Sequence, residues 1–321
     1  MPVGNSDKGV GLWAGQVMLS LDNVNQYIDW WHEALPNSQE TFDHNGLMGS
    51  IIFSPSITVG LTNYWNLTAT QSFGTRIMSW KGDSTTIHHR NETSVSGFRN
   101  AIGGYLGDTK LMLRYLVFND GQGDGRRFFI GGGLIVPSKN TLTSDPFFLS
   151  GEEKDDHRHF SMSEGVFKAL FELQYFKKNI KNPVFIGGAL SASMPLSKNE
   201  YGYEGSNELV VGFNVLFKEI IKARLSPAIN LSLRHIGEAH WNDIEAPNSE
   251  ALILKPGLSF SRVVGSGVLG VAVLKPLFIE GEFSGADIEG LDSRISAYQM
   301  TISFRMILDY TIPWLDPFRK L

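Results

Sequence analysis

Apolar and polar residues alternate along many stretches of the chain. In residues 222–234, for example, apolar side chains such as Leu231 and Leu233 share one parity, while Lys, Arg, Ser and Asn fill most of the other. Residues 47–61 and 299–308 repeat the pattern. Because successive side chains of a strand point to opposite faces, this period of two predicts β-strands with one apolar and one polar face.

Twelve such stretches can be counted. Each is at least as long as the roughly 9 to 11 residues that cross a bilayer at a tilt, whereas strands of soluble proteins run nearer to about 5 or 6 residues. The predicted strands are residues 9–20, 47–61, 66–80, 104–118, 126–138, 160–177, 183–195, 206–217, 222–235, 251–263, 268–279 and 295–308.

The connections between these strands alternate in length. Tight links, rich in Gly and Asn, fall at residues 62–65, 119–125, 179–183, 218–221 and 264–267. Longer polar links fall at residues 21–46, 81–103, 139–159, 196–205, 236–250 and 280–294. Barrels of the bacterial outer membrane combine short periplasmic turns with long external loops, so both termini are expected on the periplasmic side.

These patterns predict an all-β fold, a closed antiparallel transmembrane β-barrel of about 12 strands. We expect a single domain over residues 1–321, with the barrel at 9–308 and a periplasmic C-terminal tail at 309–321. An even strand number lets one antiparallel chain close without an open edge in hydrocarbon. A large soluble β-sandwich also alternates, but the long strands, the rhythm of the loops and the aromatic residues near strand ends favour the barrel.

The first long link has a different pattern. In residues 21–46, Val24, Tyr27, Ile28, Trp31 and Leu35 fall at helical spacing before Pro36 stops the run. A short amphipathic helix in this loop is therefore expected. It could pack on neighbouring loops, fold into the lumen as a plug, or lie on the membrane surface.

Composition narrows the setting. The net charge is −5, there is no block of Lys and Arg that would follow a phosphate backbone, and the chain has no cysteine. Nucleic acid is thus excluded as an expected partner, together with disulfides and thiolate chemistry. We expect an outer-membrane protein of a Gram-negative bacterium whose signal peptide was removed before Met1, because residues 1–8 carry no secretory signal.

Charged residues on the polar strand faces are mostly cationic. Their side chains are predicted to line the lumen, where rings of charge set ion preference. An anion-favouring lumen is one interpretation; the other is that acidic residues of inward-folded loops, such as Asp155, Asp156 or Glu238, neutralise the cations. The candidate lumen and substrate-binding residues are Arg76, Lys110, Arg114, Lys168, Glu172, Lys222, Arg224, Arg234, Lys255 and Arg305.

Candidates for other chemistry are weaker. Imidazoles at His157 and His159 lie near carboxylates and hydroxyls, but no third ligand stands at a defined spacing. No nucleophile elbow or zinc-protease motif occurs. We therefore expect no metal, no cofactor and no enzymatic activity. Carboxylates in the last loop, residues 280–292, could bridge divalent cations to lipopolysaccharide, although a solvated loop is the simpler interpretation.

Three stretches resemble a known family. They are Ser56–Leu67, Gly104–Leu111 and Phe129–Pro137, with a tight turn, a Gly-x-x-Gly-Asp strand start and a Gly-rich strand ending in Pro. Over residues 47–163 the chain is similar to the outer-membrane barrels named for the meta-pathway of phenol degradation. The resemblance implies a transporter for small, often hydrophobic compounds and no catalytic residues. Asp309–Leu321 departs from the usual terminal aromatic residue.

The function expected from these observations is a channel or transporter for small anionic or hydrophobic molecules through a narrow basic lumen. Its partners would be membrane lipids, lipopolysaccharide and a small solute, with protein partners at the C-terminal tail or the long loops. Two other classes stay open. One is a structural barrel that anchors a larger outer-membrane assembly. The other is a lipid hydrolase, which would need His157 or His159 beside Ser161 or Ser163.

Overall fold

The described part of the chain forms one closed barrel. The computed structural model describes residues 3–33, 43–80, 104–120, 124–145, 161–246, 249–281 and 293–316. The strands are β1 (Gln16–His32), β2 (His44–Gly60), β3 (Trp65–Trp80), β4 (Leu106–Asn119), β5 (Gly125–Val136), β6 (Lys168–Lys178), β7 (Phe185–Pro195), β8 (Tyr203–Glu204), β9 (Glu208–Leu216), β10 (Ser226–Ile236), β11 (His240–Trp241), β12 (Ile244–Glu245), β13 (Ala251–Val264), β14 (Gly267–Leu274), β15 (Leu277–Glu280) and β16 (Ser293–Thr311).

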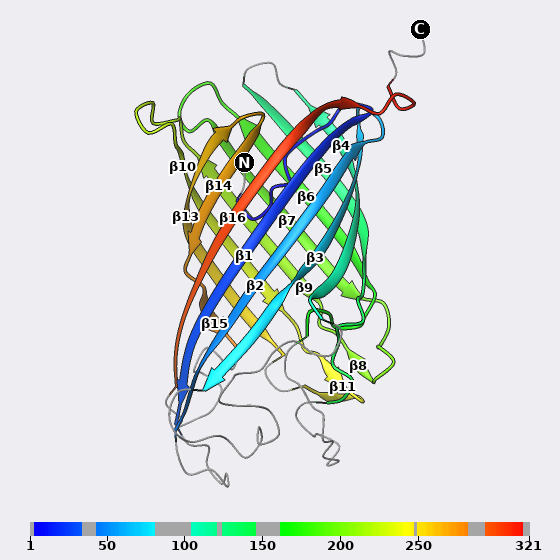
Figure 1. Cartoon of the computed structure of the whole chain (residues 1–321), viewed down its shortest axis with the longest axis vertical. Coiled ribbons are helices and arrows are strands. Elements are labelled where there is room, and N and C mark those ends of the chain that lie inside the picture. The colour runs from blue at the N-terminus through cyan, green and yellow to red at the C-terminus, as the bar shows by residue number, and fades with distance from the viewer. Residues whose placement is uncertain are drawn as a thin grey trace.

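The barrel wall has twelve antiparallel strands when β14 and β15 are counted as one interrupted strand, as the alternation predicted. Neighbours in the sequence pair around the wall, and β16 pairs with β1 to close it (Figure 1). β15 continues the line of β14 along β13 after a break at Lys275 and Pro276. Among the described residues, no helix is long and apolar enough to span a membrane.

The two faces of the wall differ in chemistry. Large apolar side chains point outward and stay exposed, for instance Leu67, Ile229 and Phe213. Small polar side chains point inward and hydrogen-bond across the ladder, as Thr58 does with Thr68 at 2.9 Å. In a membrane the exposed apolar face meets hydrocarbon, so this inside-out arrangement is what a transmembrane barrel requires.

The short turns and both ends of the described chain lie at one end of the barrel (Figure 1). Aromatic side chains lie near this end on β3, β4 and β5: the ring centroids of Trp65 and Tyr115 are 4.8 Å apart, and those of Phe118 and Phe128 are 5.9 Å apart. Outer-membrane barrels carry aromatic girdles at both interfaces, so the lengths of the connections decide the orientation. We therefore treat this end as periplasmic and the opposite end, which carries the long connections, as external.

A small cap lies at the external end. β8, β11 and β12 form a separate three-stranded sheet whose buried Trp241 packs against Tyr203, Leu142 and two alanines (Figure 1). The segment before β6 also folds inward, because Ser163 donates its N–H to the Asn140 oxygen at 3.0 Å and Val166 is buried. The predicted strand at 160–177 therefore begins only at Lys168.

Two further sequence predictions are wrong at strand ends. The predicted loop and helix at residues 21–46 do not form over residues 21–32, since β1 continues to His32 and pairs on both sides with β2 and β16. Leu35 and Pro36 lie outside the described residues. Residues 9–15, predicted as strand, are irregular: Gly9 and Gly15 have positive φ angles of 75° and 81°, which L-residues rarely adopt in an extended chain.

Candidate functional site: a plugged lumen

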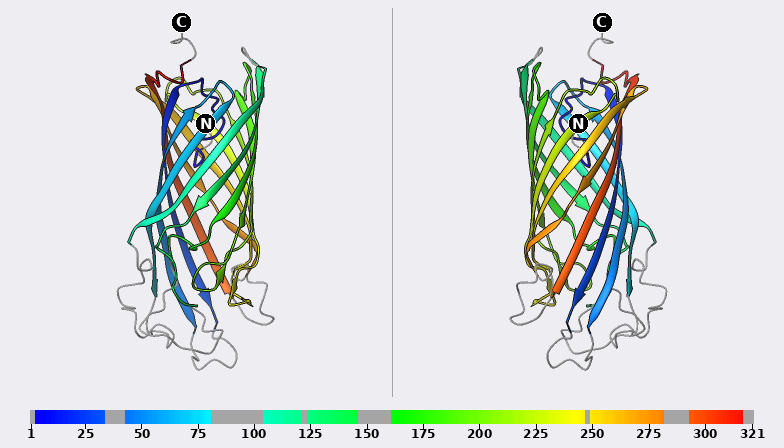
Figure 2. Two further views of the ribbon diagram at one scale, coloured as in Figure 1. Left: turned by 90° about the vertical axis from the view of Figure 1, so that its right-hand side faces the viewer. Right: turned by 90° about the vertical axis from the view of Figure 1, so that its left-hand side faces the viewer.

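The N-terminal segment, residues 3–15, lies inside the barrel. It enters at the periplasmic end and runs within the lumen before β1 begins (Figures 1 and 2). Lys8 and Leu12 of this segment are buried, with 8% and 1% of their surface exposed. A polar stretch that fills a pore must find partners for its charges, so its contacts define the site.

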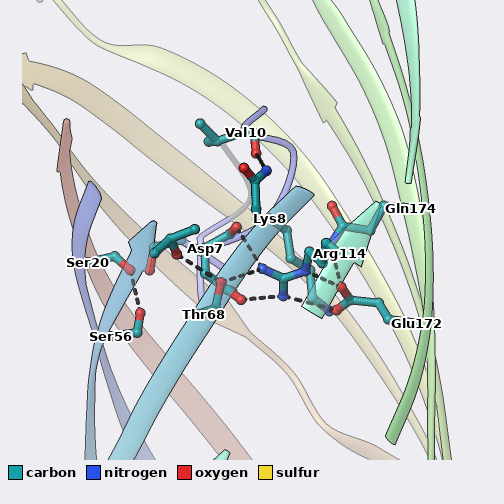
Figure 3. A network of polar contacts seen from close by, with 12 residues as sticks. Asp7, Lys8, Val10, Ser20, Ser56, Thr68, Arg114, Glu172 and Gln174 are labelled. Atoms are coloured by element: carbon teal, nitrogen blue, oxygen red, sulfur yellow. Dashed lines mark hydrogen bonds and ion pairs between the residues drawn. The ribbon is translucent and has the colours of Figure 1, made fainter. Parts of the chain in front are cut away.

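Arg114, on the inner face of β4, is the main anchor of this segment (Figure 3). Its Nη2 donates to Asp7 Oδ2 at 2.5 Å, its Nε donates to Glu172 Oε1 at 2.5 Å, and its Nη1 donates to Thr68 Oγ1 at 3.1 Å. The same Nη1 reaches the backbone oxygen of Asp7 at 3.3 Å. The planar guanidinium has five N–H donors in a fixed fork, and here it ties the segment to three strands of the wall.

The rest of the cluster balances the charge. Lys8 Nζ lies 3.3 Å from Glu172 Oε2, so Glu172 faces two cations. Gln174 Nε2 donates to Glu172 Oε1 at 2.5 Å, while Gln174 Oε1 accepts the backbone N–H of Gly9 at 2.9 Å. Buried charges are tolerated when they are paired and hydrogen-bonded, and this cluster meets both conditions.

The pKa of Asp7 reflects the same surroundings. Burial by itself would raise the pKa of this carboxyl group above its ordinary 3.8, but the charges of Arg114, Lys110 and Lys8 outweigh burial and hold the pKa well below that value. Asp7 therefore remains an anion at any pH above 3.8, and the ion pair that holds the segment persists across the physiological range.

A second set of bonds ties the segment to β1 and β16. Ser6 donates from its N–H and its hydroxyl to Asp22 Oδ2, at 3.2 and 3.0 Å. Ser303 Oγ donates to Asp22 Oδ1 at 2.5 Å and accepts the N–H of Gly4 at 2.6 Å. Arg305 Nη1 donates to the backbone oxygens of Ser6 and Lys8, at 3.3 and 3.2 Å. The segment is thus held from opposite sides of the lumen.

Apolar packing adds to the anchor on the side of β4 and β6. Leu116, Phe129 and Phe176 form a buried cluster on β4, β5 and β6. A Cβ on Gly9 would lie 3.2 Å from the Phe176 ring, and one on Gly11 would lie 3.5 Å from Leu116. Glycines let the backbone lie flat on these side chains.

The end of the segment crosses β2 at Gly60. Gly15 donates its N–H to the Gly60 oxygen at 2.7 Å, and a Cβ on Gly60 would lie 2.1 Å from the Trp13 carbonyl oxygen. We expect Gly60→Ala to lower the free energy of unfolding by about 1–3 kcal/mol, because backbone would have to move. Urea unfolding in detergent measures the effect. The control Gly212→Ala should change little, since its Cβ would come no closer than 3.9 Å to another atom; equal stability of the two variants would contradict this packing.

The segment does not fill the lumen completely. A cavity of about 100 Å³ lies between it and the inner faces of β7, β9 and β10, whose lining side chains are small or neutral, including Ser191, Asn214 and Ser232. A second cavity of about 460 Å³ opens toward the periplasmic end. Phe176 lines both cavities. The two cavities lie along the segment with Phe176 between them, and we refer to them together as the passage.

The charged side chains along this passage have one sign. Among the described residues that line the two cavities, they are Lys8, Arg127, Lys178 and Arg305. Arg127 and Lys178 extend from β5 and β6 at the periplasmic mouth, and Arg127 Nε donates to Asn119 Oδ1 at 3.1 Å. Cations that line a constriction lower the energy of an anion there more than that of a cation.

The structure places most of the candidate lumen residues on inner faces. Arg114, Glu172 and Arg305 contact the N-terminal segment, and Lys110 lies four residues before Arg114 on the same face of β4. Nearer the external end, Arg234 binds Glu208 through two bonds of 3.0 and 2.8 Å, with Lys255 on the neighbouring strand. Lys168 pairs with Glu164 at 2.7 Å, and Arg76 Nη1 donates to the Ser161 oxygen at 2.8 Å.

Lys222 and Arg224 are exceptions. Both are exposed in the turn before β10, which begins at Ser226, and Arg224 has a φ of 51°. Their prediction as lumen residues is wrong, because the alternation in the sequence ran on through a turn of four residues. The sequence also missed Asp7, Lys8 and Gln174 as site residues; the first two were assigned to a polar N-terminus outside the barrel.

Other chemistry finds little support in the described residues. No group of three or more His, Asp or Glu side chains there could hold a metal ion. His157 and His159 lie outside the described residues, as do Asp155 and Asp156. Ser161 and Ser163 hydrogen-bond within their own segment, where Ser161 Oγ donates to the Ser163 oxygen at 2.7 Å.

The fold is similar to that of solved outer-membrane proteins, although sequence comparison finds no match. No family model matches the chain, and no curated protein matches it. The fold is similar to the crystal structure of the COG4313 outer membrane channel from Pseudomonas putida F1, with a TM-score of 0.63 and 13% sequence identity over 96% of this chain and 100% of that chain. The translocator domain of the autotransporter NalP from Neisseria meningitidis gives a TM-score of 0.44 at 10% identity, over 95% and 92% of the two chains.

These findings define the class of the protein. A closed antiparallel barrel of twelve strands, apolar outside and polar inside, is an outer-membrane β-barrel. The chain is therefore a Gram-negative outer-membrane protein, as its sequence predicted.

Proposed function

We propose that this protein is an outer-membrane channel for small organic anions, which pass between the docked N-terminal segment and the wall formed by β7, β9 and β10. The observation that carries the proposal is the passage itself, lined by cations and by neutral polar groups. Val268 and Ile307 add an apolar surface to the periplasmic cavity, which suits a solute with an apolar body and an anionic group.

Pairing of the lumen charges is the main argument against a strongly basic pore. Arg114, Lys168 and Arg234 each face a carboxylate at 2.5 to 2.8 Å, so their fields are largely cancelled. The neutralising acids are Asp7, Glu172, Glu164 and Glu208, and not only loop residues as one interpretation of the sequence held. The proposed anion preference therefore rests on the cations of the passage.

The family resemblance noted in the sequence supports this proposal. Residues 47–163 include most of β2 and all of β3, β4 and β5, with the turns and Gly-rich strand that resemble the barrels of the meta-pathway of phenol degradation. The Pseudomonas putida protein of similar fold carries the name of a channel, which agrees with the role proposed for this chain. The size and polarity of the passage support a small solute.

Neutralising the periplasmic mouth tests the proposal. We expect Arg127→Gln combined with Lys178→Gln to reduce the anion preference by roughly half, because field at a constriction sets selectivity. Reversal potentials in a planar bilayer with a salt gradient measure the change. Neither side chain holds the N-terminal segment in the contacts described above.

The matched control is Arg126→Gln. Arg126 neighbours Arg127 on β5 but faces outward, where its Nη2 pairs with Asp120 at 2.6 Å. This variant should conduct like the wild type. An unchanged reversal potential in the double variant, or an equal shift in the control, would refute the proposed role of the mouth.

A further inference from the structure

The break between β14 and β15 places a lysine on the outer wall. β16 pairs with β1 along its length but with β14 only as far as Gln299 and Leu274, so among the described strands β1 is its one partner beyond that point. Lys275 lies at this break, where its Nζ donates to Ser296 Oγ at 2.9 Å and lies 3.9 Å from the centroid of the Tyr298 ring. Tyr298 faces outward and is 53% exposed.

A second cation lies on the same outer face. The Arg294 guanidinium lies 4.8 Å from the ring of Trp31, its partner in the ladder between β16 and β1. In the same ladder Tyr27 pairs with Tyr298, and Ser296 lies between these two rungs. Two cations, each held against an aromatic ring, therefore lie at the external end of one strip of the wall. Cation–π contacts fix such side chains at a boundary between apolar and wet surroundings.

An apolar groove begins next to these cations, on the side toward the middle of the barrel wall. It has a volume of about 360 Å³ and crosses β16, β1, β2 and β3 on the outer surface. Tyr27, Tyr298, Met300, Ile51 and Ile77 line it, and Gly49 leaves its floor without a side chain. This groove is separate from the lumen, because these large side chains are all on the exposed, lipid-facing side.

We propose that this strip binds a phosphorylated glycolipid of the outer leaflet, the lipid A part of lipopolysaccharide, with a phosphate at Lys275 and Arg294 and an acyl chain in the groove. Charge complementarity carries the choice of ligand. The cations lie at the external end, where the leaflet consists of acylated, phosphorylated sugars, and the apolar groove extends from them toward the membrane centre. Charge-assisted bonds to phosphate are strong where water is partly excluded.

A carboxylate also lies on this face in the described part of the chain. It belongs to Asp29, which pairs in the ladder with Ser296, the residue that Lys275 contacts. A phosphate bound at Lys275 would be repelled by this group, so Asp29→Asn should tighten binding. The proposal thus predicts changes of opposite sign at two positions of one small patch.

The test is lipid binding by the purified full chain in detergent, followed by native mass spectrometry. The probes are hexa-acylated lipid A with two phosphates, the same lipid A after dephosphorylation, and phosphatidylglycerol. We expect the phosphorylated lipid A to bind about tenfold more tightly than the dephosphorylated form, the scale of one good charge-assisted contact. Lys275→Gln with Arg294→Gln should abolish that difference.

Two further variants separate the parts of the site. Thr75→Phe places a ring in the groove and should weaken both forms of lipid A equally. Lys218→Gln with Lys222→Gln removes two exposed lysines at the periplasmic end and should leave binding unchanged; resistance of the unheated barrel to SDS shows that each variant is folded. Retained discrimination in the Lys275 and Arg294 variant would overturn the proposal, as would equally tight binding of phosphatidylglycerol.

Discussion

Deletion of residues 3–11 should raise the single-channel conductance on the order of fivefold. The segment forms one side of both cavities, so its removal leaves the full lumen of a twelve-stranded barrel, a width between filled eight-stranded barrels and open porins. Trp13 and Gly15 are retained because they pack on the end of β2. Planar bilayer recordings in symmetric salt give the comparison.

The barrel itself should survive this deletion. Arg114 and Glu172 still pair with each other at 2.5 Å after Asp7 and Lys8 are gone. Anion preference should fall at the same time, because a wider pore holds its ions farther from the cations of the wall. A folded deletion variant with wild-type conductance would show that the segment does not limit the passage.

Arg114→Leu should be the most destabilising single substitution in the site. The substitution leaves Asp7 without its close cation. Glu172 loses the nearer of its two cations, Arg114, and keeps Lys8, while both carboxylates stay buried. Breaking one side of a buried ion pair costs about 3–5 kcal/mol. Urea unfolding followed by tryptophan fluorescence should show a loss of this size, together with release of the N-terminal segment.

Two comparisons isolate the cause of that loss. Arg114→Leu with Asp7→Asn removes the charge that has lost its cation, leaves Glu172 paired with Lys8 at 3.3 Å, and should recover a good part of the stability. Asp120→Asn breaks the exposed pair with Arg126 and should cost less than about 1 kcal/mol, as surface pairs do. If Arg114→Leu unfolded at the wild-type urea concentration, the cluster would not be what holds the segment.

Most of the wall could be predicted from the sequence because lipid and lumen impose opposite chemistry on alternate residues. Strands such as β2 and β13 carry long runs of clean alternation, and their observed ends lie within three residues of the predicted ones. The barrel closes with the predicted number of strands. The alternation predicted the strands correctly where each side chain faces either lipid or the polar lumen.

The pattern failed where that condition does not hold. In β1, Asn23, Asn25 and Asp29 face outward among apolar neighbours, while Val24 and Ile28 face inward, so no period of two is visible. Pairing with two long neighbours decides the structure there, since strand formation depends on context more than on local preference.

The centre of the site could be predicted only in part. Arg114 and Glu172 were expected on the inner face, and the structure places both there. Their partner Asp7 is 107 positions away from Arg114 in the chain, and no local pattern in residues 3–15 signals that they fold into the lumen. Lumen contacts between a terminus and the wall are long-range, so composition and periodicity carry no information on them.

Thiol labelling tests the central claim, a water-filled passage beside the docked segment, most directly. The chain has no cysteine, so a single introduced thiol reports without background. Ser191 lines the passage, whereas Ala192 on the same strand faces the lipid, so the two variants are Ser191→Cys and Ala192→Cys. In lipid vesicles, a small anionic methanethiosulfonate should modify the thiol at 191 and leave the one at 192 unmodified. An unreactive thiol at position 191 in the folded, full-length barrel, with Lys222→Cys in the exposed turn labelled normally, would contradict the account.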